Sequence, residues 1–159
     1  MSDDARFEDG AERPLNLGAL DGEDLGVISA LVQDAVLPVT EISWQPGKRR
    51  LGLLLNRVRW EDVEAATRRG RPVERVQSLL VVDTVLGMSS QGLDRTDRDV
   101  VLSVLSVTFE PGEAPGGHVV LTLAGDGAIR ASVEALEVSL RDVTRPYVAP
   151  SGKAPSHPE

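Results

Sequence analysis

The stretch from residue 48 to residue 60 constrains the fold most, because it is almost continuously apolar in its middle and carries arginines at both ends. Read as a β-strand, it places Gly52 and Leu54 on one face and three further leucines on the other. A strand that is apolar on both faces needs cover on both sides. Because Gly52 leaves room beside Leu54, we expect a helix at residues 22–36 to cover that face. The leucines of the opposite face are Leu51, Leu53 and Leu55.

The N-terminal part of the chain predicts an edge strand and then this helix. Residues 15–20 alternate as an edge strand does. Asp21 is a typical N-cap, and apolar residues recur at helical spacing after it. Pro38 disfavours helical geometry at the residue before it, which predicts the end of the helix there.

A change of period after Pro38 predicts a hairpin. Residues 39–45 alternate as a half-buried strand, and residues 49–58 form the leucine strand. The Pro46–Gly47 pair between them predicts a type II turn with Gly47 at the position of positive φ. Residues 61–67 are expected to form a helical turn that Gly70 closes.

The second half of the chain predicts further antiparallel strands. Residues 73–88 are rich in β-branched side chains and long enough to bend, and residues 99–109 alternate on two apolar faces. Residues 118–124 and 128–143 read as a hairpin around an Asp-Gly turn. The second arm is long, so we expect a bulge or break near Ala135–Leu136.

These elements predict an α+β fold, an antiparallel β-meander of about six or seven strands curled toward a barrel, with one N-terminal helix packed on it. An open two-layer sandwich is the alternative. With 159 residues, of which 41% are hydrophobic and 26% charged, the chain fits one soluble domain. We predict a disordered acidic tail at 1–14, a single domain at 15–145 and a flexible proline-rich tail at 146–159.

The charge is unevenly distributed. The chain has a net charge of −8, and residues 1–12 carry five carboxylates against one arginine. Residues 48–75 carry nine cations against four carboxylates, a net of +5. This pattern predicts a solvated basic face or a docking patch for an anionic partner. General nucleic-acid binding is disfavoured by the net charge, although RNA contact through residues 48–75 is a weaker hypothesis.

We interpret the chain as a non-enzymatic binding or assembly module, with an unidentified protein or another anionic molecule as partner. Tryptophan and arginine are frequent at binding hot spots, and an exposed sheet edge would also permit a homodimer. The predicted binding residues are Trp44, Arg49, Arg50, Arg57, Arg59 and Trp60.

The alternative is a small enzyme that uses Asp83, His118 and an arginine in the mouth of a barrel. The chain has no cysteine, and its glycine-rich loops lack the residues of a phosphate cradle, so no cofactor is predicted. A calcium site at Asp94, Asp97 and Asp99 is disfavoured because arginines intervene and no glycine follows, which leaves a self-neutralising surface turn.

The N-terminus is acidic where a secretory signal is basic and then apolar, and no apolar run approaches the roughly 20 residues of a membrane span. A cytoplasmic location without membrane contact is therefore expected.

Three groups of segments carry a family resemblance. They are Asp21-Gly22-Glu23-Asp24-Leu25 leading to residues 31–36, then Leu53-Leu54-Leu55-Asn56-Arg57, then residues 109–115. Together they resemble a family of small bacterial proteins known as a domain of unknown function, over roughly residues 15–143. The resemblance implies a cytoplasmic bacterial accessory protein and brings no activity, cofactor or catalytic residue with it.

Overall fold

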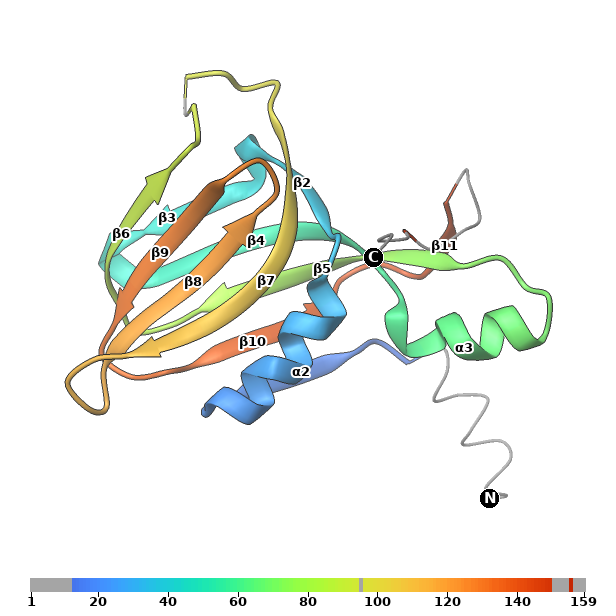
Figure 1. Ribbon diagram of the computed structural model, residues 1–159, viewed down its shortest axis with the longest axis horizontal. Helices are drawn as coiled ribbons and strands as arrows, with labels where there is room; N and C mark the ends of the chain where they lie inside the picture. The colour runs from blue at the N-terminus through green and yellow to red at the C-terminus, as the bar shows by residue number, and fades with distance from the viewer. Residues whose placement is uncertain (1–12, 95, 150–154, 156–159) are drawn as a thin grey trace.

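The computed structural model describes residues 13–94, 96–149 and 155. In this part of the chain, eleven strands form one antiparallel sheet that two α-helices accompany (Figure 1). In chain order the elements are β1 (Asn16–Ala19), α2 (Gly22–Val32), β2 (Val36–Pro38), η1 (Val39–Glu41), β3 (Ile42–Gln45), η2 (Pro46–Lys48), β4 (Arg50–Val58), α3 (Trp60–Arg68), β5 (Glu74–Val82), β6 (Val85–Gln91), β7 (Val101–Pro111), β8 (Gly117–Leu123), β9 (Gly127–Val133), β10 (Val138–Asp142) and β11 (Tyr147–Val148).

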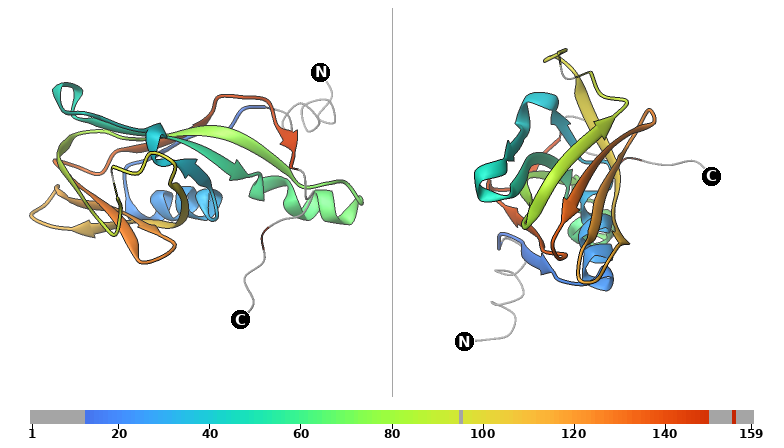
Figure 2. Two further views of the ribbon diagram at one scale, coloured as in Figure 1. Left: turned by 90° about the horizontal axis from the view of Figure 1, so that it is seen from above. Right: turned by 90° about the vertical axis from the view of Figure 1, so that its left-hand side faces the viewer.

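The sheet folds over into two layers that face each other (Figure 2). Its strand order is β1-β10-β5-β4-β2-β7-β8-β9-β6, with β3 paired to β4 and β11 paired to β5. We call β1, β10, β5, β4 and β3 the first layer, and β6 to β9 the second layer. The short strand β2 joins them, because Val36 pairs with Asn56 of β4 and also with Ser103 of β7.

The antiparallel α+β class is confirmed, but the predicted strand number and the curling toward a barrel are wrong. The strand order runs from β1 to β6 without closing. The two long apolar segments each form two strands, and in the first of them the chain changes layer at Thr84, whose φ is 56°. The predicted bend in residues 73–88 thus separates β5 from β6, and the predicted break near Ala135–Leu136 separates β9 from β10.

The leucine strand β4 lies at the centre of the first layer, as its alternation predicts. Leu51, Leu53 and Leu55 are fully buried, in one core with Leu25 and Ile28 of α2. Burial of a leucine side chain stabilises a fold by roughly 1.5–3 kcal/mol. This core lies between the two layers, and α2 packs against β7, β1 and β4.

The helix covers the opposite face of β4 from the one we predicted. It lies on the side of the buried leucines, whereas Gly52 and Leu54 are half-buried on the outer face of the first layer. The second layer shares the inner side with α2, so the sheet buries its fully apolar face there and leaves the mixed face outside.

Helix α2 begins as predicted, since the carboxylate of Asp21 accepts the amide N–H of Asp24 at 2.9 Å. It ends at Val32, four residues before the predicted end. Asp34 has a φ of 63° and donates its amide to Val104 O at 2.8 Å. Pairing with β7 therefore takes the chain out of the helix before Pro38.

The hairpin of β3 and β4 is confirmed, with Ile42 opposite Leu53 and Gln45 opposite Arg50. The predicted type II turn is wrong: residues 46–48 form a 3-10 turn, and Arg49 takes the left-handed conformation with a φ of 52°. The Arg49 carbonyl accepts a hydrogen bond from the amide of Val85 at 2.8 Å. This bond to the first residue of β6 holds Arg49 in the left-handed conformation.

The predicted helical turn is present as α3, which spans residues 60–68 and is followed by Gly70 at a φ of 66°. Residues 147–148 form β11 against Arg75 and Glu74, inside the segment predicted as a C-terminal tail. The predicted N-terminal tail lies outside the described residues except for positions 13 and 14, and the C-terminal one is described only at 146–149 and 155.

Candidate functional site

The arginines predicted to form one binding face are divided between the interior and the surface. Arg57 has no exposed surface and Arg59 is 6% exposed, whereas Arg49 and Arg50 are exposed. Arg57 and Arg59 therefore belong to the interior. Arginine is normally a surface residue, so the sequence pattern alone predicted that Arg57 and Arg59 would be exposed.

Arg57 uses all five of its N–H groups within the protein. Nε donates to Ser78 Oγ at 2.9 Å, and Nη1 donates to Val58 O at 3.1 Å. Both terminal nitrogens donate to the carboxylate of Glu61 at 2.8 Å, and Nη2 also donates to Asp142 Oδ1 at 3.0 Å. These bonds connect β4, β5, β10 and α3.

Asp142 completes this group. Its side chain is 4% exposed. Oδ1 accepts from Ser78 Oγ at 2.7 Å, and Oδ2 accepts the amide of Leu15 at 2.9 Å. Burial alone lowers the pKa of Arg57, but hydrogen bonds and charge from Glu61 and Asp142 outweigh it, so the pKa lies above its ordinary value. The guanidinium is a structural cation.

Arg59 belongs to a second network at the start of α3. Its Nη1 lies 2.6 Å from Glu74 Oε1 and 3.6 Å from Asp62 Oδ2. Arg71 donates to both carboxylate oxygens of Asp62, at 3.2 and 3.3 Å. Three of the four carboxylates in the basic stretch, including Glu61, thus neutralise its arginines.

Of the remaining predicted residues, Trp44, Arg49 and Arg50 lie near one another at the β3–β4 turn, and Trp60 lies apart from them. Arg49 pairs with Glu134, and Arg50 Nε donates to Asp83 Oδ1 at 2.9 Å. Trp60 donates Nε1–H to Gln33 O at 2.9 Å and lies where α3 begins, at the opposite end of β4 from Trp44 (Figure 1).

The residues of the enzyme hypothesis are not brought together. Asp83 lies at the corner between β5 and β6 and lines a hollow on the outer face of the first layer. His118 lies on β8 in the second layer, opposite Glu110 and Ser132, and does not line that hollow.

The acidic loop before β7 forms a turn stabilised by its own side chains. Asp94 Oδ1 accepts the amide of Thr96 at 2.9 Å and also its hydroxyl, and Asp97 Oδ1 accepts the amide of Asp99 at 3.1 Å. The Thr96 hydroxyl, followed by its amide, lowers the pKa of Asp94 below the ordinary range. No group of three potential metal ligands occurs among the described residues.

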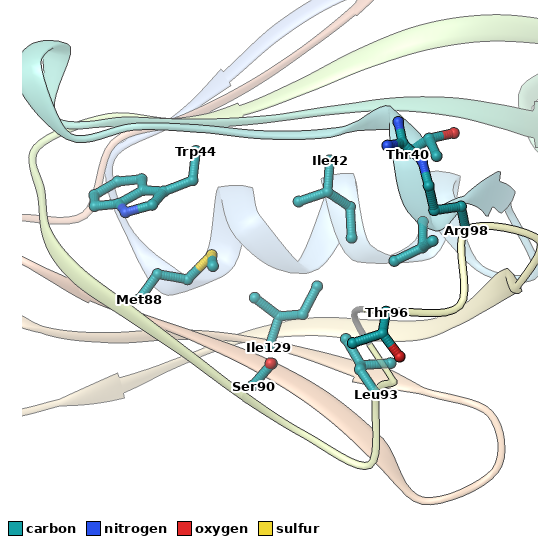
Figure 3. A pocket seen from close by; sticks show the side chains of 10 residues that line it. Thr40, Ile42, Trp44, Met88, Ser90, Leu93, Thr96, Arg98 and Ile129 are labelled. Carbon is teal, nitrogen blue, oxygen red and sulfur yellow. The ribbon is translucent and has the colours of Figure 1, made fainter.

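Trp44 lines a cleft between the two layers (Figure 3). Trp44 and Ile42 lie opposite Leu51 and Leu53 of β4, which places them on the inner side of the first layer. The edge of β3 that is not paired with β4 faces β6 of the second layer. The cleft has a volume of about 520 Å³ and is lined by Val39, Thr40, Ile42, Trp44, Met88, Ser90, Leu93, Thr96, Arg98 and Ile129.

As far as the described residues show, the cleft is apolar along most of its length and carries one cation, Arg98, at one end. Trp44 and Met88 lie at one end, Ile42 and Ile129 face each other in the middle, and Arg98 lies at the other end (Figure 3). No described residue forms an ion pair or a hydrogen bond with the Arg98 side chain. This arrangement is suited to an apolar molecule that ends in an anionic group.

Among the residues predicted from the sequence, only Trp44 lines this cleft. Met88, Arg98 and Ile129 were missed because they come from β6, a loop and β9, which meet β3 only in the folded protein. No local pattern marks them, since Met88 and Ile129 read as ordinary strand residues and Arg98 as one charge in an acidic turn.

The fold and the cleft define an α+β protein whose single antiparallel sheet is bent into two layers around an apolar core. The chain belongs to a family described as proteins of unknown function, DUF2948, whose family model matches residues 15–157. This confirms the resemblance seen in the sequence. A search of curated proteins and a search of solved structures found no match.

Neither α2 nor α3, the α-helices of the described part, has the length and apolar character needed to cross a membrane.

Proposed function

We propose that the protein is a non-enzymatic binding module and that its ligand lies in the cleft between β3 and β6. The ligand is a small molecule with an elongated apolar body and one anionic group. The observation that carries this proposal is an apolar cleft between the sheet layers with Arg98 at one end, a cation with which no residue in the described part of the chain pairs. The proposal keeps the predicted binding module and moves its site away from the arginines of β4.

The apolar body would lie among Trp44, Met88, Ile42 and Ile129. Trp44, Ile42 and Met88 are half-buried and pack against the core, so a ligand there removes apolar surface from water on both sides. The volume of about 520 Å³ falls within the usual range for small-molecule sites, roughly 300–1,000 Å³.

The anionic group would bind Arg98. A guanidinium presents a planar fork that matches a carboxylate or phosphate in a bidentate manner. Arg98 is exposed, so we expect the pair to add only about 1 kcal/mol, or about fivefold in affinity. Apolar contact therefore provides most of the affinity, and Arg98 orients the ligand.

The cleft supports binding rather than catalysis. Among the described residues that line the cleft, Arg98 is the one ionisable side chain, and an arginine stays protonated near neutral pH. Acid-base catalysis requires a group that titrates in the working range within hydrogen-bond reach of the substrate. The Asp83 and His118 enzyme hypothesis therefore has no support from the cleft.

The test uses the fluorescence of Trp44. The sequence has two tryptophans, so Trp60→Phe leaves Trp44 as the sole reporter. Linear carboxylates of increasing chain length are titrated into the protein, and alcohols of the same chain lengths are titrated in parallel for comparison. We expect a saturable change in emission, tighter binding with length, and about fivefold tighter binding of each carboxylate.

Arg98→Gln should remove the advantage of the carboxylate and leave the alcohol affinity unchanged. Lys48→Gln is the matched control, because it makes the same change in net charge at an exposed residue outside the cleft. The proposal is wrong if no chain length gives saturable binding, or if Arg98→Gln and Lys48→Gln behave alike.

The free edges of β3 and β6 beside the cleft also favour a second candidate, a homodimer formed by strand pairing. Light scattering after size exclusion tests it, and a monomer over a range of concentrations would exclude it. The arginine-face and RNA hypotheses stay predictions, tested by exchanging Arg49 and Arg50 for glutamate and measuring partner binding.

A further inference from the structure

The outer face of the first layer contains a second, separate hollow, which the proposed function does not use. Its floor is formed by Leu54, Leu79 and Val81, which are half-buried. Leu54 pairs with Leu79, and Gly52 pairs with Val81, so the four positions form one contiguous patch across β4 and β5. The hollow has a volume of about 620 Å³.

Gly52 in this patch is not required by the geometry of the strand. Its φ is not in the left-handed region, and a Cβ added there would meet no atom within 4 Å. A glycine inside a strand weakens it, and such a glycine often marks a place where another group approaches closely. The described part of the chain places no group there, so the space above Gly52 is available to an occupant.

The rim of the hollow is positively charged. It includes the cations Lys48, Arg50 and Arg141 and the carboxylates Glu41 and Asp83. Arg50 is paired with Asp83, whereas no described residue pairs with Lys48 or Arg141. An occupant that matches this face carries negative charge together with an apolar anchor.

Residues 1–12 of the chain have this chemistry. They carry Asp3, Asp4, Glu8, Asp9 and Glu12 against Arg6, and their one aromatic residue is Phe7. They precede β1, the edge strand of the same layer, and Asn16 of β1 itself lines the hollow.

The length of this segment is sufficient. From β1 to β4 there are three strand spacings in the order β1-β10-β5-β4, which is about 14 Å at ~4.8 Å each. The nine residues from Phe7 to Asn16 span up to about 30 Å when extended. Phe7 can therefore reach the space above Gly52 from either direction along the strands.

We propose that this hollow binds residues 1–12 of the same chain, with Phe7 above Gly52 and the carboxylates beside Lys48 and Arg141. Because the segment is covalently attached, its binding is intramolecular and independent of protein concentration.

The test uses the full chain with a nitroxide on Ala5→Cys, which is a unique thiol because the sequence has no cysteine. Paramagnetic broadening of the amide NMR signals is measured at low salt and at 1 M salt, where the Debye length falls to about 3 Å. We expect strong broadening at Gly52, Leu54, Leu79 and Val81, largely lost at 1 M salt.

Two variants test the occupant against matched controls. Gly52→Val fills the hollow and should abolish the broadening, whereas Gly87→Val, an unhindered strand glycine in the second layer, should not. The double variant Lys48→Glu and Arg141→Glu should abolish it. The double variant Arg68→Glu and Arg69→Glu, with the same charge change at exposed residues of the α3 terminus, should leave it intact.

Three results would overturn the proposal. The first is broadening confined to β1 and its immediate neighbours, and the second is an equal response of the Gly52 and Gly87 variants. The third comes from a mixture of two chains, one isotope-labelled without a nitroxide and one unlabelled with the nitroxide. Broadening of the labelled chain's signals in this mixture would assign the hollow to a second copy. The amide spectrum of each variant establishes that it is folded.

Discussion

Replacement of Arg57 by methionine provides the sharpest test of the interior network. The change keeps a long unbranched side chain and removes the charge and all five donors. Asp142 then keeps Ser78 and Leu15 as partners but loses its cation, although its side chain is only 4% exposed. Removal of one partner from a buried ion pair typically destabilises a protein by about 3–5 kcal/mol.

This loss is large compared with the total stability of a domain, about 5–15 kcal/mol. The assay is urea unfolding followed by circular dichroism and tryptophan fluorescence, with the free energy of unfolding extrapolated to water. Arg57→Lys should destabilise the protein by less, because it keeps the charge but provides three donors from a single atom in place of a planar fork.

Arg50→Met is the matched control. Arg50 also lies on β4 and forms one ion pair, with Asp83, but its side chain is 47% exposed. Pairs of this kind contribute about 0–1 kcal/mol. If Arg57→Met and Arg50→Met lower the free energy of unfolding by the same small amount, the Arg57 network does not stabilise the fold and the reasoning fails.

Three further predictions concern the core, the outer face and the loop before β7. Leu53→Ala should destabilise the fold by about 2–5 kcal/mol in the same assay, and the half-buried Leu54→Ala by clearly less; equal values would contradict the assignment of the two faces. Gly52→Val should be neutral or stabilise by up to about 1 kcal/mol, and a loss of stability would show that the space above it is needed by the fold. Because the folded-state pKa of Asp94 is lowered, its contribution to stability is present above the unfolded-state pKa and is lost as the pH falls through the folded-state value. Thr96→Val should raise the pKa of Asp94 in a carboxyl NMR titration, and an unchanged midpoint would exclude the hydroxyl as the cause.

Much of the fold was predictable from local patterns. The alternation of β4, the N-cap at Asp21, the hairpin of β3 and β4 and the break near Ala135–Leu136 all correspond to observed features. Each depends on residues within a few positions of one another, so periodicity and turn chemistry are sufficient to reveal them.

The candidate site was predictable only at Trp44. Arg57 illustrates why, because its burial depends on Ser78 and Asp142, which lie 21 and 85 residues further along the chain. A run of arginines indicates a solvated surface unless the partners that satisfy them are known. The cleft likewise needs β3, β6 and β9 in two layers before it exists.

The amino-acid sequence by itself determined the family, the antiparallel α+β class, and which residues of β4 share a face of the strand. The tertiary structure alone decided which face of β4 the helix covers, which arginines are interior, and where an open cleft remains. The reason is that side-chain alternation is set within one strand, whereas burial is set by the partners that the bend at β2 and the corner at Thr84 bring across the sheet.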